Sequence, residues 1–218
     1  METETNKYDV SVILTLFNSR QTFRRALESV LKQIYKNIEL IIVDDGSTDE
    51  IEKELFPILK EYPSFKYIRH SNRKHPLSLN TGIMNSTGKY ISFLDSDDEY
   101  GSEYLTNRVL YLESNSDVDL LYSPATLIGS DEDMFVPDAK DNTKLVHLNE
   151  CIIGGTFFGK RKVFIEMNGF RNIYSHDSDF YNRALEKFKI VRFKNPDYIY
   201  YRNNPDSVIS KLKKEISV

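Results

Sequence analysis

Residues 90–98 place three carboxylates directly after an apolar segment. The apolar part is rich in β-branched and aromatic residues and lacks glycine and proline, so it predicts a buried strand. Asp95, Asp97 and Asp98 would then stand at the carboxyl edge of a sheet, where open α/β folds bind ligands. Crowded carboxylates favour a cation, and hard oxygen ligands suit Mg²⁺ or Mn²⁺ bound to phosphate oxygens. The stretch therefore indicates a metal and nucleotide-diphosphate site, with an acidic turn that caps the next helix as the alternative.

Size and composition are those of one globular domain spanning 1–218. The net charge of −4 argues against a nucleic-acid partner. The single cysteine, Cys151, excludes an internal disulfide and suits a reducing compartment. The polar, acidic start is unlike a secretion signal, and no apolar run approaches the ~20 residues that span a bilayer. We therefore expect a cytoplasmic protein, and the basic tail 206–218 leaves peripheral contact with the inner face of a membrane open.

Strands and helices alternate through the first hundred residues. Apolar runs predict strands at 10–14, 38–43, 65–69 and 90–94, and helical periodicity predicts helices at 21–33, 51–59 and 77–85. Such alternation favours right-handed βαβ units and a parallel sheet covered on both faces. Asp44 and Asp45, which end the second strand, should therefore share a crevice with the carboxylates after residue 94.

The second half predicts a less regular structure. Residues 126–149 are polar and acidic with scattered β-formers, and we expect an excursion with a small hairpin there. Gly154 and Gly155 lead into a further strand. The other expected elements are strands at 118–122, 190–193 and 198–201, and helices around 104–112, at 161–167, from 175 to 188 and in the tail.

Several families of enzyme are excluded by missing motifs. The sequence contains no G-x-G-x-x-G after the first strand, no G-x-x-x-x-G-K-[ST], no G-x-S-x-G and no set of His and Cys with zinc spacing. The remaining possibility is a nucleotide site built from carboxylates.

Three motifs in order, VSVILTLFN at 10–18, IIVDDGSTD at 41–49 and GKYISFLDSDD at 88–98, resemble the inverting family-2 glycosyltransferases with the GT-A fold. The resemblance covers residues from about 10 to about 205. It implies an α/β fold with a Rossmann-like, mostly parallel central sheet flanked by helices and a small mixed β excursion in the C-terminal half. The nucleotide-binding half would be about 8–100 and the acceptor and catalytic half about 101–205.

The resemblance implies roles for the acidic residues and the donor loop. Asp45 would accept a hydrogen bond from the base, typically uracil, while Asp44 supports the loop. Asp97 would ligate the divalent metal, Mn²⁺ or Mg²⁺, with Asp98 as a second ligand, and Asp95 would contact the ribose or support the metal site. Arg183 and Arg202 would meet phosphate or brace the acidic cluster. The residues assigned to the nucleotide and donor site are Thr15, Leu16, Phe17, Asn18, Asp44, Asp45, Asn80, Asp95, Ser96, Gly155, Arg183 and Arg202.

The catalytic base of the family lies in an acidic pair at the start of a later helix. The matching stretch here is residues 175–179, which implies Asp177 as general base and Asp179 as the alternative. As a base, Asp177 would take the proton of an acceptor hydroxyl that attacks the anomeric carbon in line with the departing nucleoside diphosphate. Both residues could instead be helix N-terminal carboxylates favoured by the helix dipole.

Three positions depart from the family pattern. His176 stands where Glu is usual, Asn204 where His is usual, and Leu79 where Arg commonly precedes Asn80, with Arg73 or Lys74 as candidates to replace that Arg. These departures leave open a partner subunit that binds nucleotide without turnover. A sugar-phosphate nucleotidyltransferase is less favoured, because residues 16–19 are not a loop rich in Gly, Arg and Lys. The expected partners are a nucleotide sugar, with UDP favoured, and a glycan, lipid-linked or glycoprotein acceptor.

Overall fold

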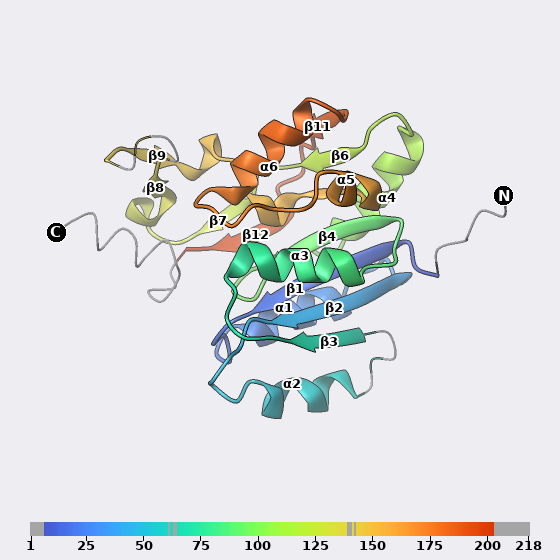
Figure 1. Cartoon of the computed structure of the whole chain (residues 1–218), viewed down its shortest axis with the longest axis vertical. Helices are drawn as coiled ribbons and strands as arrows, with labels where there is room; N and C mark the ends of the chain where they lie inside the picture. The colour runs from blue at the N-terminus through green and yellow to red at the C-terminus, as the bar shows by residue number, and fades with distance from the viewer. Residues whose placement is uncertain (1–6, 61, 63–64, 139–140, 142, 203–218) are drawn as a thin grey trace.

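The computed structural model describes residues 7–60, 62, 65–138, 141 and 143–202. Its centre is a seven-stranded sheet in the order β11-β6-β10-β4-β1-β2-β3 (Figure 1). The strands of this sheet are β1 (Val10–Leu16), β2 (Ile38–Asp44), β3 (Phe65–Arg69), β4 (Tyr90–Asp95), β6 (Leu120–Tyr122), β10 (Phe158–Lys160) and β11 (Ile190–Arg192).

The first four strands are parallel, as the alternation of strands and helices predicts. β1 lies between β2 and β4, and the register places Leu16 opposite Asp44 and Thr15 opposite Asp95. All three strands therefore end at the same edge, and the two acidic motifs lie on either side of the loop after β1. The expected α/β fold with a mostly parallel central sheet is confirmed.

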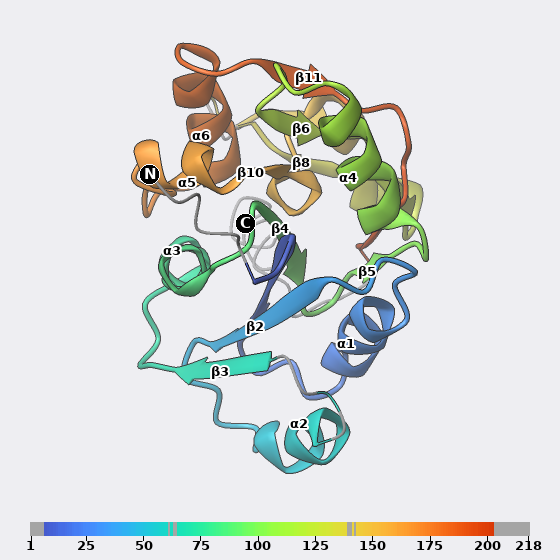
Figure 2. The ribbon, with the colours of Figure 1, turned by 90° about the vertical axis from the view of Figure 1, so that its right-hand side faces the viewer.

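Helices cover both faces of the sheet (Figure 2). Successive residues of β1 serve different cores, since Val12 and Leu14 belong to the core beneath one set of helices and Ile13 to the other. Both faces of the strand are buried, which explains an uninterrupted apolar run. One face carries α1 (Phe23–Leu31), α2 (Glu52–Leu59) and α4 (Tyr104–Ser114), and the other carries α3 (His75–Asn85), α5 (Arg161–Glu166) and α6 (His176–Leu185).

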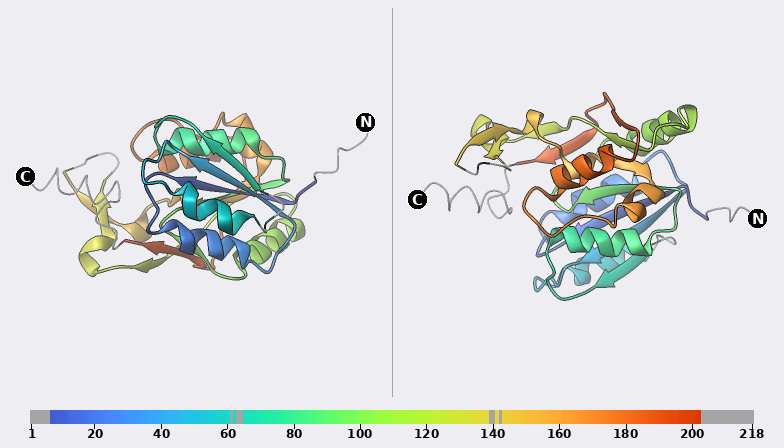
Figure 3. Two further views of the ribbon diagram at one scale, coloured as in Figure 1. Left: turned by 90° about the horizontal axis from the view of Figure 1, so that it is seen from below. Right: turned by 45° about the horizontal axis from the view of Figure 1, so that its top comes forward.

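The excursion of the second half is present and extends beyond the edge where the parallel strands end (Figure 3). A hairpin pairs β8 (Phe135–Pro137) with β9 (Leu145–His147), as expected. A separate three-stranded sheet joins β5 (Glu99–Tyr100), β12 (Tyr198–Tyr201) and β7 (Thr126–Ile128). Short 3₁₀ turns occupy Asp131–Met134, Leu148–Glu150 and Gly154–Thr156.

Two details differ from the sequence-based expectations. β10 runs antiparallel to both neighbours, and at Gly159 a Cβ would lie 2.7 Å from a methyl carbon of Leu120, so this close approach requires glycine. The third helix starts at His75 rather than at residue 77, because Pro76 is well suited to a first helical turn.

Two expectations concern residues that the structure does not describe. The tail 206–218 and Asn204 lie outside the described residues. Among the residues that are described, no helix is both long enough and apolar enough to cross a membrane.

Candidate active site

The loop after β1 is bound to the loop after β2. Asn18 donates its N–H to the Ser47 hydroxyl at 3.0 Å, and its side-chain oxygen accepts the N–H of Thr48 at 2.8 Å. Leu16 is buried and its carbonyl accepts the Asp45 N–H at 2.8 Å, whereas the Phe17 side chain is 49% exposed. An exposed aromatic ring on a fixed loop can stack against a nucleotide base.

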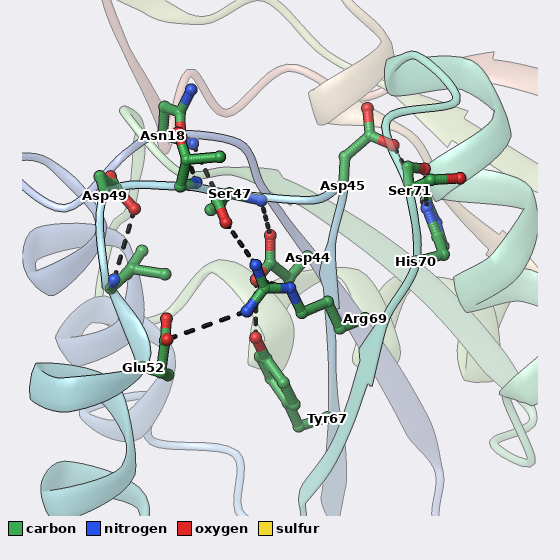
Figure 4. A network of polar contacts seen from close by, with 12 residues as sticks. Asn18, Asp44, Asp45, Ser47, Asp49, Glu52, Tyr67, Arg69, His70 and Ser71 are labelled. Atoms are coloured by element: carbon green, nitrogen blue, oxygen red, sulfur yellow. Dashed lines mark hydrogen bonds and ion pairs between the residues drawn. The ribbon is translucent and has the colours of Figure 1, made fainter.

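Asp44 is fully buried and holds this loop together (Figure 4). One of its carboxylate oxygens accepts the Ser47 N–H at 2.8 Å, and the other accepts the Tyr67 hydroxyl at 2.6 Å. Arg69 lies 3.7 Å from the second oxygen. The carboxylate is thus enclosed by donors from β3 and from its own turn, an arrangement that supports the loop.

Asp45 connects the same loop to the segment before α3. Its two oxygens accept the N–H groups of Arg73 at 2.7 Å and Lys74 at 3.0 Å, and His70 Nδ1 lies 3.3 Å away (Figure 4 labels Asp45 and His70). Lys74 has a φ of +78°, a conformation that L-residues rarely adopt. Oδ2, which accepts the Lys74 N–H, retains a second lone pair, so Asp45 can still accept a donor from a base.

Asp95, at the end of β4, forms a pair that the sequence analysis did not identify. Its Oδ1 lies 2.9 Å from His75 Nε2 and 3.5 Å from the Thr15 hydroxyl. Although burial opposes the charged forms, the attraction between the two groups raises the pKa of His75 and lowers that of Asp95. Both side chains are about one-third exposed, at 37% and 34%, so they remain partly accessible from solvent.

The two carboxylates expected to bind metal have different surroundings. Asp98 is buried, and its oxygens accept the Tyr198 hydroxyl at 2.7 Å and the Tyr201 N–H at 3.0 Å. Burial, with the negative charges of Asp97 and Asp95, raises the pKa of Asp98 well above its usual value. Asp97 is half-buried, and its main-chain carbonyl accepts a hydrogen bond from Arg25.

These residues fit a metal that takes few protein ligands. Across the described residues, no group of three or more His, Cys, Asp or Glu side chains is arranged to hold a metal by itself. Mg²⁺ and Mn²⁺ at diphosphate sites keep water and phosphate oxygens and need only one or two carboxylates. Asp97 fits this role, whereas Asp98 supports the loop in this arrangement. The neighbouring Ser96 is half-buried on the same turn.

Asp177 lies in the first turn of α6, against the Gly154 backbone. Its oxygens accept the Gly154 N–H at 3.3 Å and the Ser178 N–H at 2.8 Å, and a Cβ at position 154 would lie 3.1 Å from the Asp177 Cβ. Burial raises the pKa of Asp177 even though these N–H groups oppose the shift. A carboxylate with a raised pKa is better matched to accepting a proton near neutral pH.

The two halves of the site meet through a pair of histidines. The rings of His75 and His176 lie edge to face, with their centroids 5.3 Å apart. His75 in turn bonds to Asp95, so these contacts link Asp95 to His176, the residue that precedes Asp177 in the sequence. Burial and the positive charge of His75 lower the pKa of His176 to about 3, which keeps this imidazole neutral at physiological pH.

Asp179 and Arg183 belong to a bracing network. Asp179 pairs with Arg171 at 3.0 Å and with Arg183 at 2.8 Å. The remaining nitrogens of Arg183 donate to the carbonyls of Met167 at 2.8 Å and Gly169 at 2.9 Å, at the C-terminal end of α5. The geometry therefore places Arg183 as a brace between helices.

Three further residues from the donor-site expectations lie within the scaffold. Asn80 exchanges two hydrogen bonds of 2.8 Å with the backbone of Phe170. Gly155 approaches Tyr198 so closely that a Cβ would lie 2.3 Å from the hydroxyl. Arg202 is buried and donates to the Asp133 carbonyl at 3.2 Å, beside the excursion.

A pocket of about 270 Å³ adjoins the Asp177 side of the site. Its lining includes Ile153, which precedes Gly154, the residue whose N–H donates to Asp177. Tyr122 and Arg192 contribute from the carboxyl ends of β6 and β11, and Cys151 contributes from the segment before Gly154. The pocket therefore lies beside the segment that contacts Asp177.

We expect Cys151 to react slowly with alkylating agents. Burial, reinforced by the charge of Asp177, raises the pKa of its thiol to about 11. Only the thiolate is nucleophilic, so at pH 8 about one thiol in a thousand is reactive, against about a quarter for a free cysteine. Iodoacetamide labelling followed by mass spectrometry should be at least about 100-fold slower in the folded protein than in urea. Equal rates would show that Cys151 is not shielded.

Sequence reasoning missed His75, Arg25 and Tyr198. His75 begins a helix beside a proline, Arg25 lies in an amphipathic helix, and Tyr198 belongs to a short strand. None of these contexts is itself a functional signal. Their roles depend on contacts with Asp95, Asp97 and Asp98, which are distant in the chain.

Comparison with known proteins adds sequence and structural relatives. The model of the family described as "Glycosyl transferase family 2" matches residues 11–168. An uncharacterized glycosyltransferase of Rickettsia felis is 41% identical over 107 residues, 49% of this chain and 18% of the relative. TarS 1-349 of S. aureus in complex with UDP-GlcNAc superposes with a TM-score of 0.71 at 16% identity, covering 96% of this chain and 65% of that chain. The mannosyltransferase PcManGT of Pyrobaculum calidifontis, in complex with GDP-Man and Mn²⁺, superposes with a TM-score of 0.70 at 17% identity. The superposition covers 93% of this chain and 59% of that chain. This chain thus spans less than two thirds of each of these proteins.

Proposed function

The chain belongs to glycosyl transferase family 2, and from this we propose that it transfers a sugar from a nucleotide-diphosphate sugar to a hydroxyl group of an acceptor. The observation that carries the proposal is the continuity of the site. Asp95 bonds to His75, His75 contacts His176, and Asp177 follows at the start of α6. A donor bound beside Asp95 would therefore have a base within the same crevice.

The donor would lie along the ends of β1, β2 and β4. The exposed ring of Phe17 would cover the base, and Asp45 would accept its N–H through a remaining lone pair. A uracil base presents such a donor at N3, so we favour UDP-linked sugars. The UDP-GlcNAc complex of TarS supports this choice, and the GDP-Man complex of PcManGT makes guanine the base to test next.

Asp177 would act as the general base in a single displacement. It would take the proton of the acceptor hydroxyl as that oxygen forms a bond to the anomeric carbon. The bond from that carbon to the diphosphate oxygen breaks at the same time, and its electron pair leaves with the nucleoside diphosphate. Attack opposite to the leaving group inverts the anomeric centre, and no covalent sugar–enzyme intermediate forms.

Asp97 is the residue that we assign to the metal. A bound Mn²⁺ or Mg²⁺ would neutralise the negative charge that builds on the leaving diphosphate. The Mn²⁺ complex of PcManGT supports a divalent metal in this fold. Asp98 would hold the loop through Tyr198 rather than touch the metal.

The pocket of about 270 Å³ is our candidate entrance for the acceptor. It adjoins Gly154, whose N–H is bound by Asp177, so a hydroxyl entering there would approach the base. Its lining combines apolar side chains such as Ile152 and Leu148 with the polar Asn149 and Glu150. A glycan or another hydroxyl-bearing glycoconjugate suits such a mixed surface.

Calorimetric titration with UDP tests the nucleotide and metal site. We expect the wild-type protein to bind UDP more tightly with Mn²⁺ than with EDTA, and Asp97→Ala to lose this difference because the metal would lack its protein carboxylate. The exposed Asp131→Ala is the matched control and should behave like the wild type. If the wild type binds neither UDP nor GDP with Mn²⁺, the proposed function is wrong.

A further inference from the structure

One stripe of α1 and its C-terminal extension is polar and directed at the acidic loop. Arg25, Ser29 and Gln33 are spaced by four residues, so they share one side of the helix. All three contact the segment that follows β4. Arg25 Nη2 donates to the Asp97 carbonyl, and Ser29 Oγ accepts the Tyr100 N–H at 3.1 Å. The Gln33 side chain donates through Nε2 to the Gly101 carbonyl at 2.7 Å and accepts the Leu105 N–H at Oε1 at 3.1 Å.

Arg25 is the member of this stripe that reaches Asp97 in the acidic loop after β4. Its guanidinium carbon lies 3.4 Å from the centroid of the Tyr201 ring, in stacking contact. Its Nε is buried and has no hydrogen-bond partner among the described residues, so the group is held by the ring and by the Asp97 carbonyl. Arg25 as a whole is half-buried, so the loss of water at its buried Nε is the cost that these contacts must offset.

Tyr201 holds the same loop from the other side. Its N–H donates to Asp98 Oδ1 at 3.0 Å, and its hydroxyl donates to Glu99 at 3.1 Å. Arg25 therefore lies between the loop and the strand that carries Tyr201. The helix after the donor loop and the last described strand together restrain the stretch that contains Asp97.

We infer that Arg25 is a positioning residue that sets the direction of the Asp97 carboxylate. The peptide group is planar, so fixing the Asp97 carbonyl limits the rotation of that residue and the direction of its Cα–Cβ bond. Groups that orient a metal ligand commonly change metal affinity by about 10- to 100-fold when removed. The metal part of this inference rests on the proposed function, whereas the restraint on the loop does not.

Lysine should not fully replace arginine here. The contact with Tyr201 needs a flat cation that lies over the ring while one of its nitrogens donates sideways to the carbonyl. Lys has a compact ammonium on a flexible stem and cannot make both contacts with the same geometry.

The test compares Arg25→Met and Arg25→Lys with Arg24→Met. Arg24 is the neighbouring residue, is 56% exposed and lies 3.8 Å from Glu28, so its loss should leave the loop unchanged. UDP calorimetry over a series of Mn²⁺ concentrations gives the Mn²⁺ midpoint for each variant. For Arg25→Met we expect this midpoint to rise by about 10- to 100-fold with UDP binding in EDTA unchanged. For Arg25→Lys we expect a smaller rise.

Hydrogen exchange provides a readout that needs neither metal nor nucleotide. In the free protein, amides of residues 96–101 should exchange faster in Arg25→Met than in Arg24→Met, while amides of β1 and β2 stay protected. Exchange equal to that of Arg24→Met would overturn the inference. Arg25→Lys supplies the same comparison if Arg25→Met fails to fold.

The two proposals can fail separately. A wild type without metal-dependent nucleotide binding refutes the proposed function, and the exchange rates alone then decide whether Arg25 restrains the loop. Faster exchange with an unchanged Mn²⁺ midpoint would overturn the link to the metal, because the loop would then loosen without moving Asp97.

Discussion

Replacing Asp177 with asparagine should lower kcat by roughly 10²- to 10⁴-fold, the usual contribution of a general base, while UDP binding stays unchanged. Asparagine keeps the shape of the side chain and can still accept the Gly154 N–H, but it cannot take a proton at this position. Sugar transfer measured by release of UDP, beside calorimetric binding of UDP, separates chemistry from binding.

Asp179→Asn is the matched control for the base. Asp179 is bound by Arg171 and Arg183, so its replacement should lower the thermal stability more than kcat. A larger loss of kcat in Asp179→Asn than in Asp177→Asn would reverse the assignment. A wild-type protein that binds UDP but neither hydrolyses nor transfers the sugar would instead support a non-catalytic partner subunit.

The pH profile tests the same carboxylate in the wild type. The base must be ionised, and burial raises the pKa of Asp177 above that of an ordinary aspartate. Activity should therefore fall as the pH drops through this raised pKa, earlier on acidification than an exposed aspartate would allow. The residual activity of Asp177→Asn should lack this acidic limb.

Replacing Asp197 with alanine should lower the free energy of unfolding by about 3–5 kcal/mol. The Arg108 guanidinium is fully buried, and its Nη1 lies 2.6 Å from Asp197 Oδ1. It also lies 3.4 Å from the centroid of the Tyr104 ring, and its Nη2 donates to Ser123 at 3.0 Å. Removing the carboxylate leaves a buried charge without its counter-ion. Urea denaturation monitored by circular dichroism measures the loss.

Two further variants test this explanation. Asp117→Ala removes an exposed carboxylate that pairs with Lys189, and we expect a change of about 0–1 kcal/mol. The double variant Arg108→Met, Asp197→Leu removes both charges and should be much more stable than Asp197→Ala alone. Equal losses in the single and double variants would mean that lost packing, rather than the unpaired charge, causes the effect.

The architecture of the first half could be predicted because each strand carries its own signal. The run at 10–14 is apolar throughout since β1 is buried on both faces, and the parallel direction follows from the helices between strands. Parallel strands must end at one edge, so the sequence also predicted that Asp44 and Asp95 lie at the same edge of the sheet.

The surroundings of the site residues could not be predicted in the same way. Asp45 was expected to face the base, yet both of its oxygens also bind the backbone before α3. Asp98 was expected as a second metal ligand, and its oxygens also accept hydrogen bonds from Tyr198 and Tyr201. Local patterns predict where a carboxylate leaves a strand but not which donors meet it.

Helix α4 shows most clearly what sequence patterns could not predict. Hydrophobic periodicity predicted this helix but not its buried face, since Leu110 is 60% exposed while Arg108 is fully buried. A charged residue is compatible with the core only where a counter-ion and an aromatic face are supplied, here by Asp197 and Tyr104. The sequence of the helix contains no sign of a carboxylate that is contributed from the segment before β12.

The sequence by itself therefore determined the α/β class, the family and the edge where the acidic motifs gather, because hydrophobic periodicity and strand ends are local properties of the chain. Only the tertiary structure decided that His75 joins Asp95 to His176 and that Arg25 reaches Asp97, 72 residues away. The direction of a polar side chain depends on partners from distant segments, and those partners become neighbours only when the sheet and its helices have packed.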